Sequence, residues 1–245
     1  MTQEKQLIFG VHPVLEKLRA SPADVSEILI AEGAARSVEA AARPLGVKIS
    51  YRAREILDRL APHQTHQGVI AKVAPFSYLS VSELFQTIST STGSVEVLAL
   101  DGLNDPRNFG ALLRTAEAVG IRHVIIPKDR AVDVTPVVVK ASAGAVHYLK
   151  IYKATNLRRA IGGLKDQGLW IAGLDARAKK NVYDQHLPDK VAVIIGGEGA
   201  GIRPLISREC DFLLSIPMVG TIESLNVSVA GAVFLYEMFR QKYKR

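Results

Sequence analysis

Residues 224–228 read Ser-Leu-Asn-Val-Ser, and they open a helix in which the residues that follow, Val229 to Tyr236, are apolar or small on every side. A surface helix carries apolar residues along one stripe only, so this composition predicts a helix that is buried all round. Ser224 is a favourable N-cap residue for it. The polar Asn226 and Ser228 at its buried start need hydrogen-bond partners. We expect these partners in a bound ligand or the facing loops, with the neighbouring backbone as the alternative.

This helix ends a series in which apolar strands alternate with helices. Strands are predicted at residues 95–100, 123–126, 169–173, 191–195 and 212–216. Nearly continuous apolar strands separated by helices indicate a parallel sheet that is covered on both faces. Ligands of such sheets bind beyond the carboxyl ends of the strands. The functional residues are therefore expected in the loops that follow the strands.

The first of these loops runs from Asp101 to Asn108 and leads into a helix. Asn108 suits the N-cap position of that helix. Arg114 lies one turn beyond Gly110 and points away from the apolar face, so its guanidinium can reach a phosphate or a ribose. An arginine on a solvated helix surface is the alternative interpretation.

The second loop, Gly196 to Gly201, is rich in glycine, which lets backbone amides and carbonyls approach a ligand closely. A plain turn and a dinucleotide site are alternatives. A dinucleotide fingerprint belongs in the first strand-to-helix turn of its domain, whereas only one strand and one long helix follow this loop. This position disfavours a nucleotide-dependent oxidoreductase, and the lack of a Gly-x-x-x-x-Gly-Lys-Ser/Thr loop disfavours a nucleotide triphosphatase.

The N-terminal part of the chain has its own alternation of helices and strands. Its pattern predicts a small α/β domain over residues 1–75, with strands at 27–31, 47–50 and 68–73 and helices at 14–18, 36–45 and 54–60. Residues 76–94 end in a hydroxyl-rich tract without apolar periodicity and are predicted to be a linker. The second domain is then expected over residues 95–245.

Composition limits the class of protein. The 245 residues carry a formal charge of +7, which favours an anionic partner such as nucleic acid, although charge alone leaves this open. No apolar run is long enough to cross a bilayer, and the N-terminus has no apolar signal core. We therefore expect a cytoplasmic protein, with Cys210, its only cysteine, as a small filler. The histidines are scattered, so no metal site is predicted.

Three motifs in these loops resemble those of the SpoU family of RNA 2'-O-ribose methyltransferases. They are Asn108-x-Gly110-x-x-x-Arg114-x-Ala116, Gly196-x-Glu198-x-x-Gly201, and Ile216-Pro217-Met218 followed by Ser224-Leu225-Asn226-Val227-Ser228. The segment Lys140 to Ala145 resembles a further signature of the family. The resemblance covers nearly the whole chain and is strongest to bacterial enzymes that methylate a guanosine ribose in 23S rRNA.

The resemblance implies a parallel sheet with a C-terminal deep trefoil knot, preceded by a small α/β RNA-binding domain, and a homodimer formed through the catalytic domain. It implies S-adenosylmethionine as cofactor, held around Gly173, Gly196, Gly201, Ile216 and Leu225. The residues expected around the reacting ribose are Asn108, Arg114, Glu198, Ser224 and Asn226, with Arg114 acting across the dimer.

A guanidinium keeps its proton in proteins, so we expect Arg114 to hold the substrate phosphate rather than to act as a base. Two alternatives to a 23S rRNA enzyme stay open. One is a tRNA 2'-O-methyltransferase, and the other is a non-catalytic RNA-binding protein. Cofactor binding distinguishes the second alternative from either enzyme.

Overall fold

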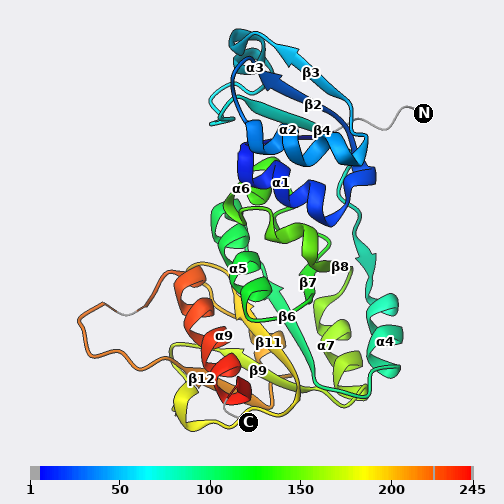
Figure 1. Ribbon diagram of the computed structural model, residues 1–245. Coiled ribbons are helices and arrows are strands. Elements are labelled where there is room, and N and C mark those ends of the chain that lie inside the picture. Colours follow the sequence, from blue (N-terminus) through cyan, green and yellow to red (C-terminus); the bar gives the residue numbers. More distant parts are fainter. Residues whose placement is uncertain (1–5, 223, 244–245) are drawn as a thin grey trace. The chain divides into compact units, whose positions relative to one another are not determined.

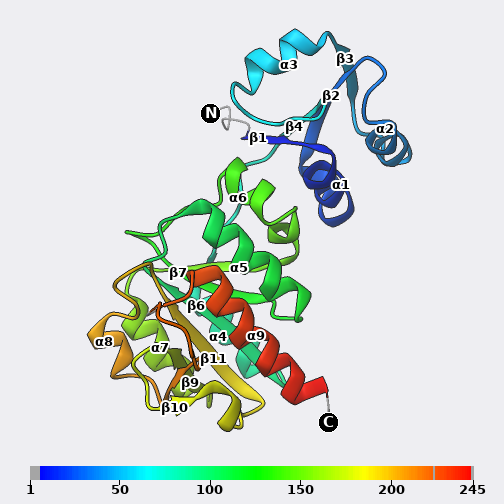
Figure 2. The same cartoon turned by 90° about the vertical axis from the view of Figure 1, so that its left-hand side faces the viewer.

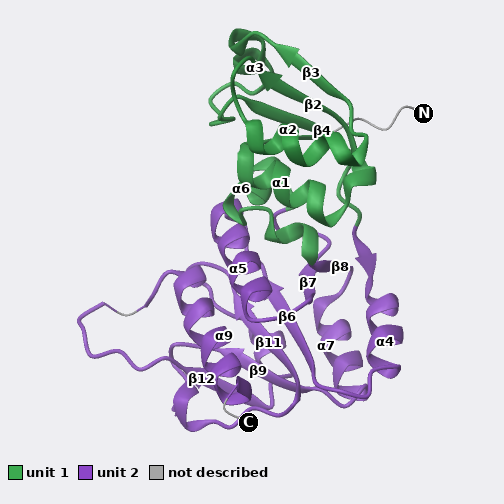
Figure 3. Cartoon of the chain, viewed as in Figure 1, with its two compact units in different colours: residues 1–77, 133–148 green, residues 78–132, 149–245 purple. Residues whose placement is uncertain are grey.

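Two β-sheets organise the chain in a computed structural model that describes residues 6–222 and 224–243 (Figure 1). One sheet has four strands in the order β1-β4-β2-β3, and the other has eight in the order β10-β12-β9-β11-β6-β7-β8-β5. The chain divides into two compact units (Figure 3). Unit 1 comprises the residues up to Ser77 together with Asp133–Tyr148, and unit 2 comprises Tyr78–Val132 and the residues from Leu149 onwards.

Unit 1 is built around the four-stranded sheet. Strand β2 pairs with β3 in parallel, whereas β4 runs antiparallel to both β1 and β2. The short strand β1 is absent from the sequence prediction, because four residues at the start of the chain show too little periodicity to be recognised. Its elements are β1 (Gln6–Phe9), α1 (Val11–Ala20), β2 (Val25–Ala31), α2 (Arg36–Ala42), β3 (Ile49–Arg52), α3 (Arg54–Leu60) and β4 (Val69–Val73).

Unit 2 contains the eight-stranded sheet, and all its strand pairs are parallel, as the apolar strand pattern predicts. The strands are β5 (Leu79–Ser80), β6 (Val95–Asp101), β7 (His123–Pro127), β8 (Lys150–Ala154), β9 (Trp170–Leu174), β10 (Lys180–Asn181), β11 (Lys190–Gly196) and β12 (Phe212–Ser215). The main helices are α4 (Val81–Ser89), α5 (Pro106–Ala118), α7 (Leu157–Asp166), α8 (Pro204–Ser207) and α9 (Val227–Tyr243).

Helices cover both faces of this sheet. Val97, Ala99 and Ile194 point to one face, where they form a buried core with residues of α4 and α7. On the other face α9 packs against α5 and β11 (Figure 2). The packing is close, since a Cβ atom added to Gly231 of α9 would lie 2.3 Å from Leu112 Cδ2 and 2.8 Å from Ile195 Cδ1.

The segment 76–94, predicted to be a linker, instead contains helix α4. Ser80 caps this helix, because its hydroxyl accepts a hydrogen bond from the Glu83 amide while the Glu83 carboxylate accepts one from the Ser80 amide. The hydroxyls of Thr87 and Thr90 donate to backbone carbonyls of the preceding turn. Leu84 and Ile88 are fully buried. The linker prediction is wrong because these hydroxyl groups bond to the backbone of the helix itself.

The segment Asp133–Tyr148 interrupts the domain that the sequence places at 95–245, because it packs within unit 1. It contains helix α6 (Pro136–Ala141) and the family signature at Lys140 to Ala145. Tyr148 donates a hydrogen bond to Glu16 at 2.5 Å, and a Cβ atom on Gly144 would lie 2.5 Å from Glu16 Cβ. The signature therefore serves the packing of unit 1, where glycine is needed for close approach.

Helix α9 is not buried all round in the single chain. Phe234, Leu235 and Met238 are buried against unit 2, whereas Val229 and Tyr236 are 50% and 52% exposed. The prediction of complete burial is wrong for the single chain, because only one side of α9 packs against other residues of the same chain. None of the helices among residues 6–222 and 224–243 combines the length and apolarity that crossing a membrane requires.

Candidate functional site

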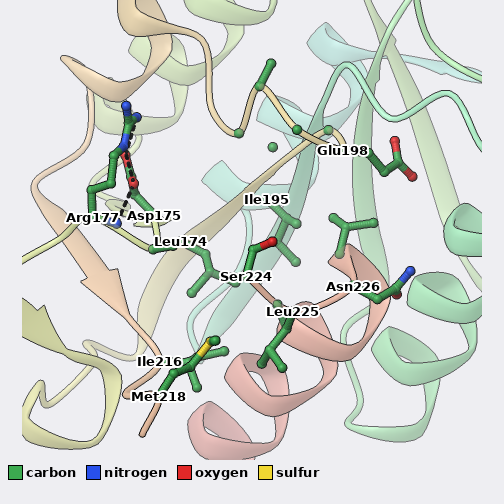
Figure 4. Close-up of a pocket in the computed structure, with 18 residues that line it drawn as sticks. Leu174, Asp175, Arg177, Ile195, Glu198, Ile216, Met218, Ser224, Leu225 and Asn226 are labelled. Atoms are coloured by element: carbon green, nitrogen blue, oxygen red, sulfur yellow. Dashed lines mark hydrogen bonds and ion pairs between the residues drawn. The ribbon is translucent and has the colours of Figure 1, made fainter. Parts of the chain in front are cut away.

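A pocket of about 600 Å³ lies where β9, β11 and β12 end and α9 begins (Figure 4). Its position beyond the carboxyl ends of parallel strands is the one expected for this architecture. Small-molecule sites typically have volumes of roughly 300–1,000 Å³, so the pocket can hold a ligand of that class. Three loops and the first turn of α9 line it, namely Leu174 to Arg177, Ile195 to Gly201, Ile216 with Met218, and Ser224 to Val227 with Ala230.

The glycine-rich loop after β11 is tightly folded. A Cβ atom on Gly196 would lie 2.0 Å from the Gly201 carbonyl carbon, and one on Gly197 would lie 2.3 Å from the Gly102 oxygen. Gly199 and Gly201 have φ angles of +77° and +64°, which favour glycine. The fold of the loop therefore requires glycine at these positions, and every residue from Gly197 to Gly201 lines the pocket.

Side chains from three elements form a hydrogen-bonded chain beside this loop. The Asn226 amide nitrogen donates to Asn108 Oδ1 at 3.1 Å, and the Asn108 amide nitrogen donates to Glu198 Oε1 at 2.7 Å. Asn226 Oδ1 accepts from the backbone amides of Ser228 and Val229 at 2.9 and 3.3 Å. These backbone donors fix the orientation of the Asn226 amide, which in turn fixes that of Asn108. The Asn108 amide therefore donates its hydrogen bond to Oε1 of Glu198 in a fixed orientation.

The helix caps differ from those that the sequence predicts. Asp105 caps α5 by accepting from the amides of Arg107 and Asn108 at 3.1 and 3.4 Å, with Pro106 as the first helical residue. Asn108 therefore lies inside the first turn, where its side chain is free to bond to Glu198. Asn226, not Ser224, caps α9, and Ser224 instead lines the pocket. In both cases the residue that caps is about as favourable as the one predicted, and the position at which the backbone turns into the helix decides between them.

Two predicted site residues lie apart from the pocket, and a third, Asn108, lies outside its lining but is hydrogen-bonded to Glu198, which lines it. Arg114 is exposed on α5, about 9 Å along the helix axis from Asn108, and within residues 6–222 and 224–243 it has no acidic partner. Gly173 packs inside unit 2, since a Cβ atom there would lie 2.8 Å from Cys210 Sγ. The structure does bring together the other predicted residues, which are Asn108, Gly196, Glu198, Gly201, Ile216, Ser224, Leu225 and Asn226.

The pocket also contains charged residues that the sequence analysis did not identify. The guanidinium of Arg177 bonds to the Asp175 carboxylate at 3.2 Å, and this bond lowers the pKa of Asp175 (Figure 4). Asp175 therefore supplies a carboxylate acceptor to the wall of the pocket. It directly follows β9, so its place after a strand end is the one signal in the sequence that could have identified it.

Cys210 is partly buried, and burial together with neighbouring Asp211 raises the pKa of its thiol to about 12. A thiol of this kind stays protonated at neutral pH and is a poor nucleophile. This agrees with the expected role as a small filler. Among the residues that the structure describes, no group of three or more potential ligands is placed to hold a metal ion.

Comparison with known proteins shows two family matches. The model of the SpoU rRNA Methylase family matches residues 96–236, and a model described as RNA 2'-O ribose methyltransferase substrate binding matches residues 7–79. The chain is 40% identical over 239 residues to the 23S rRNA (guanosine-2'-O-)-methyltransferase RlmB of Coxiella burnetii, covering 96% of this chain and 95% of that protein.

Two further proteins are similar over almost the full length. YacO of Bacillus subtilis, assigned to the TrmH family of tRNA/rRNA methyltransferases, is 37% identical over 246 residues, which cover 99% of this chain and 98% of that protein. The crystal structure of AviRb from Streptomyces viridochromogenes, a SpoU methyltransferase in complex with AdoMet, superposes with a TM-score of 0.83 at 22% identity. It covers 98% of this chain and 92% of AviRb. At this identity the superposition establishes a shared fold.

Proposed function

Because the chain belongs to the SpoU rRNA methylase family, we propose that it transfers a methyl group from S-adenosylmethionine to the ribose 2'-hydroxyl of a guanosine in 23S rRNA. The observation that carries the proposal is the oriented chain Asn226–Asn108–Glu198 beside a pocket of cofactor size. The guanosine in 23S rRNA rests on the relative from Coxiella burnetii. A tRNA substrate is the alternative, since the name of the Bacillus relative includes both RNAs.

The pocket fits the proposed cofactor. Gly197, Gly199 and Gly201 line the pocket without side chains, so a ligand beside them would meet backbone amides and carbonyls. Ile216, Met218 and Leu225 supply apolar surface for an adenine ring. The carboxylate of Asp175 would accept hydrogen bonds from ligand hydroxyl or ammonium groups. When bound, S-adenosylmethionine supplies an electrophilic methyl group on its sulfonium.

The residues of the chain would contribute mainly by alignment, because holding two reactants in line can lower a barrier by up to roughly 7–11 kcal/mol. Glu198 Oε1 accepts from Asn108, and among the described residues no donor is bonded to Oε2. That oxygen would accept the hydrogen bond of the ribose hydroxyl and so orient it. Arg114 would hold the substrate phosphate and stabilise negative charge that develops on the attacking oxygen.

Two measurements test this function. Calorimetry should detect S-adenosylmethionine binding to the full chain, which a non-catalytic RNA-binding protein would lack. Mapping 2'-O-methylation on ribosomal and transfer RNA from cells without this protein should show one missing methyl group on a 23S rRNA guanosine. Loss of a methyl group from tRNA alone would support the alternative substrate, and unchanged methylation of both RNAs would contradict the proposal.

Unit 1 is the proposed RNA-binding part, in line with the substrate-binding model that matches residues 7–79. Its exposed arginines include three that form no salt bridge to a carboxylate among the described residues: Arg36, Arg54 and Arg59. By contrast, Arg43 forms an ion pair with Glu39 at 2.5 Å. Unpaired arginines are available to neutralise RNA phosphates, and this binding is salt-dependent.

The triple variant Arg36→Gln, Arg54→Gln, Arg59→Gln should therefore bind 23S rRNA at least about tenfold more weakly at low salt. Its plot of log affinity against log salt should become shallower by about one for each RNA phosphate that the variant no longer neutralises. Arg43→Gln is the control and should change both quantities little, while cofactor affinity stays constant in all variants. An unchanged salt slope in the triple variant would refute a role for these arginines.

A homodimer formed through α9 is also part of the proposal. The exposed side of this helix carries Val229 and Tyr236, and Tyr236 packs edge-on to Phe239, which stacks on Tyr243 at 5.4 Å between ring centroids. Such a continuous aromatic surface is typical of an interface. It would complete the burial that the sequence of α9 predicts. It would also let Arg114, which lies outside the pocket of its own chain, act at the pocket of the partner.

Tyr236→Arg should shift the protein from dimer to monomer in sedimentation experiments, because a desolvated guanidinium would be unpaired at the interface. Methyl transfer should fall together with dimer content. Tyr183→Arg, which changes another half-exposed tyrosine in unit 2, is the matched control and should remain dimeric. A Tyr236→Arg variant that stays dimeric would place the interface elsewhere.

The proposal includes a C-terminal trefoil knot and a cytoplasmic location. Support for the knot comes from the path after β12, which lies next to β9 in the sheet. The chain runs from there past the pocket and then packs α9 against α5 and β11. The three loops that the knot would bring together are those that line the pocket. The cytoplasmic location follows from the proposed ribosomal substrate.

A further inference from the structure

Asp101 is a buried carboxylate that does not line the pocket. It ends β6, its side chain is 0% exposed, and its neighbour in the sheet is Gly196 at the end of β11. Burying a carboxylate is costly unless it is paired and hydrogen-bonded. Its partners therefore indicate why an ionised group is placed there.

The partners of Asp101 lie at both ends of the glycine-rich loop. Its backbone carbonyl accepts from the Gly197 amide at 2.9 Å, where the loop begins. Its carboxylate accepts from the Arg203 amide at 2.8 Å and from the Arg203 guanidinium at 2.7 and 2.6 Å, just after the loop ends. The loop is closed further by a hydrogen bond from the Gly201 amide to the Gly197 carbonyl at 3.1 Å.

We propose that Asp101 and Arg203 are positioning residues, which hold the loop Gly197–Gly201 in the shape that binds the cofactor and presents Glu198. This inference rests on the proposed function for the identity of the ligand. Every residue of this loop lines the pocket, whereas Asp101 does not, so the pair acts through the loop.

A purely structural role accounts for the pair less well. Even for a fully buried ion pair, replacement by apolar residues of similar volume is often neutral or stabilising, so this partly exposed pair is not needed for stability alone. The pair instead fixes the orientation of the chain at the end of the loop, because the two oxygens of a carboxylate can bind a backbone amide and a guanidinium at once. The Arg203 side chain is itself 52% exposed, so it contributes little to the core.

The test uses three variants of the full chain. Asp101→Asn replaces one carboxylate oxygen by an NH₂ group, which would face either the Arg203 backbone amide or the Arg203 guanidinium as one donor against another. Arg203→Ala removes the guanidinium and keeps the backbone bond, and Arg203→Lys keeps the charge without the planar fork. The control is Arg122→Ala, which removes an arginine paired with Glu117 at 2.7 Å outside the pocket.

We expect the dissociation constant of S-adenosylmethionine, measured by calorimetry, to rise at least about tenfold in Asp101→Asn and Arg203→Ala and less in Arg203→Lys. Hydrogen exchange of the Gly197–Arg203 amides in the cofactor-free protein should accelerate in the same order. RNA affinity and exchange elsewhere in unit 2 should not change, and Arg122→Ala should match the wild type in every measurement.

Wild-type cofactor affinity or unchanged loop exchange in Arg203→Ala would overturn the inference. Faster exchange throughout unit 2 would also overturn it in favour of a general structural role. If Asp101→Asn does not fold, the half-exposed Arg203 side chain still allows the comparison of Arg203→Ala with Arg203→Lys. If the wild type itself fails to bind S-adenosylmethionine, the proposed function is wrong. Hydrogen exchange of the loop in the cofactor-free protein still shows whether Asp101 and Arg203 hold the loop in place.

Discussion

Arg114→Ala should lose at least about a hundredfold in methyl transfer while its affinity for S-adenosylmethionine stays near that of the wild type. The reason is its position, since Arg114 is exposed on α5 and outside the pocket lining, so the cofactor does not need it. Removing one group that stabilises developing charge typically costs 10²- to 10³-fold in rate. Single-turnover assays and calorimetry give the two quantities separately, and retained turnover would contradict the role assigned to Arg114.

A mixing experiment tests whether Arg114 acts across the proposed dimer. Arg114→Ala and Glu198→Gln should each be nearly inactive as homodimers. A heterodimer of the two contains one site with an intact Glu198 and an Arg114 from the other chain. Activity should therefore reappear on mixing if the arginine acts on the partner's pocket, whereas it should stay absent if both groups must belong to one chain.

Gly196→Ala should abolish measurable binding of S-adenosylmethionine, with a loss of at least about a hundredfold. The added Cβ atom would lie 2.0 Å from the Gly201 carbonyl carbon, 2.3 Å from its oxygen and 2.2 Å from the Ile202 nitrogen. These are backbone atoms, so the loop has to move as a whole and the pocket loses its shape. Calorimetry measures the affinity, and thermal unfolding shows whether the variant remains folded.

The matched control is Gly162→Ala in helix α7. A Cβ atom there meets nothing within 4 Å, and alanine is favoured over glycine inside a helix by up to about 1 kcal/mol. This variant should bind the cofactor like the wild type and be slightly more stable. Near-normal cofactor affinity in Gly196→Ala would show that the cofactor binds outside this pocket.

The sequence predicts the fold of unit 2 well where strands are apolar throughout, as in β6 and β11. Strand β8 escapes prediction, because Lys150 and Lys153 interrupt a short apolar run whose side chains are buried only after the sheet assembles. Helix α4 is also missed, in this case because of local interactions: its hydroxyl groups, which suggested a linker, bond to the backbone of the preceding turn. The composition of α9 predicts burial that a single chain does not provide.

The candidate site is predictable to the extent that its residues lie directly after strands or in the family motifs. The loop Gly196–Gly201 and the residues Asn108 and Asn226 are predictable in this way. Asp101 directly follows a predicted strand, but its role is not predictable, because its partner Arg203 is 102 positions away along the chain and becomes a neighbour only through the pairing of β6 with β11. The capping roles of Asp105 and Asn226 likewise depend on where the backbone turns into a helix.

The most direct test of the central claim is to identify the methylated nucleoside. Purified protein would be incubated with methyl-labelled S-adenosylmethionine and 23S rRNA from cells that lack it, and the RNA would be digested to nucleosides. We expect the label to elute as 2'-O-methylguanosine and Arg114→Ala to transfer almost none. Label on a base, or no transfer to any RNA by protein that binds the cofactor, would contradict this expectation.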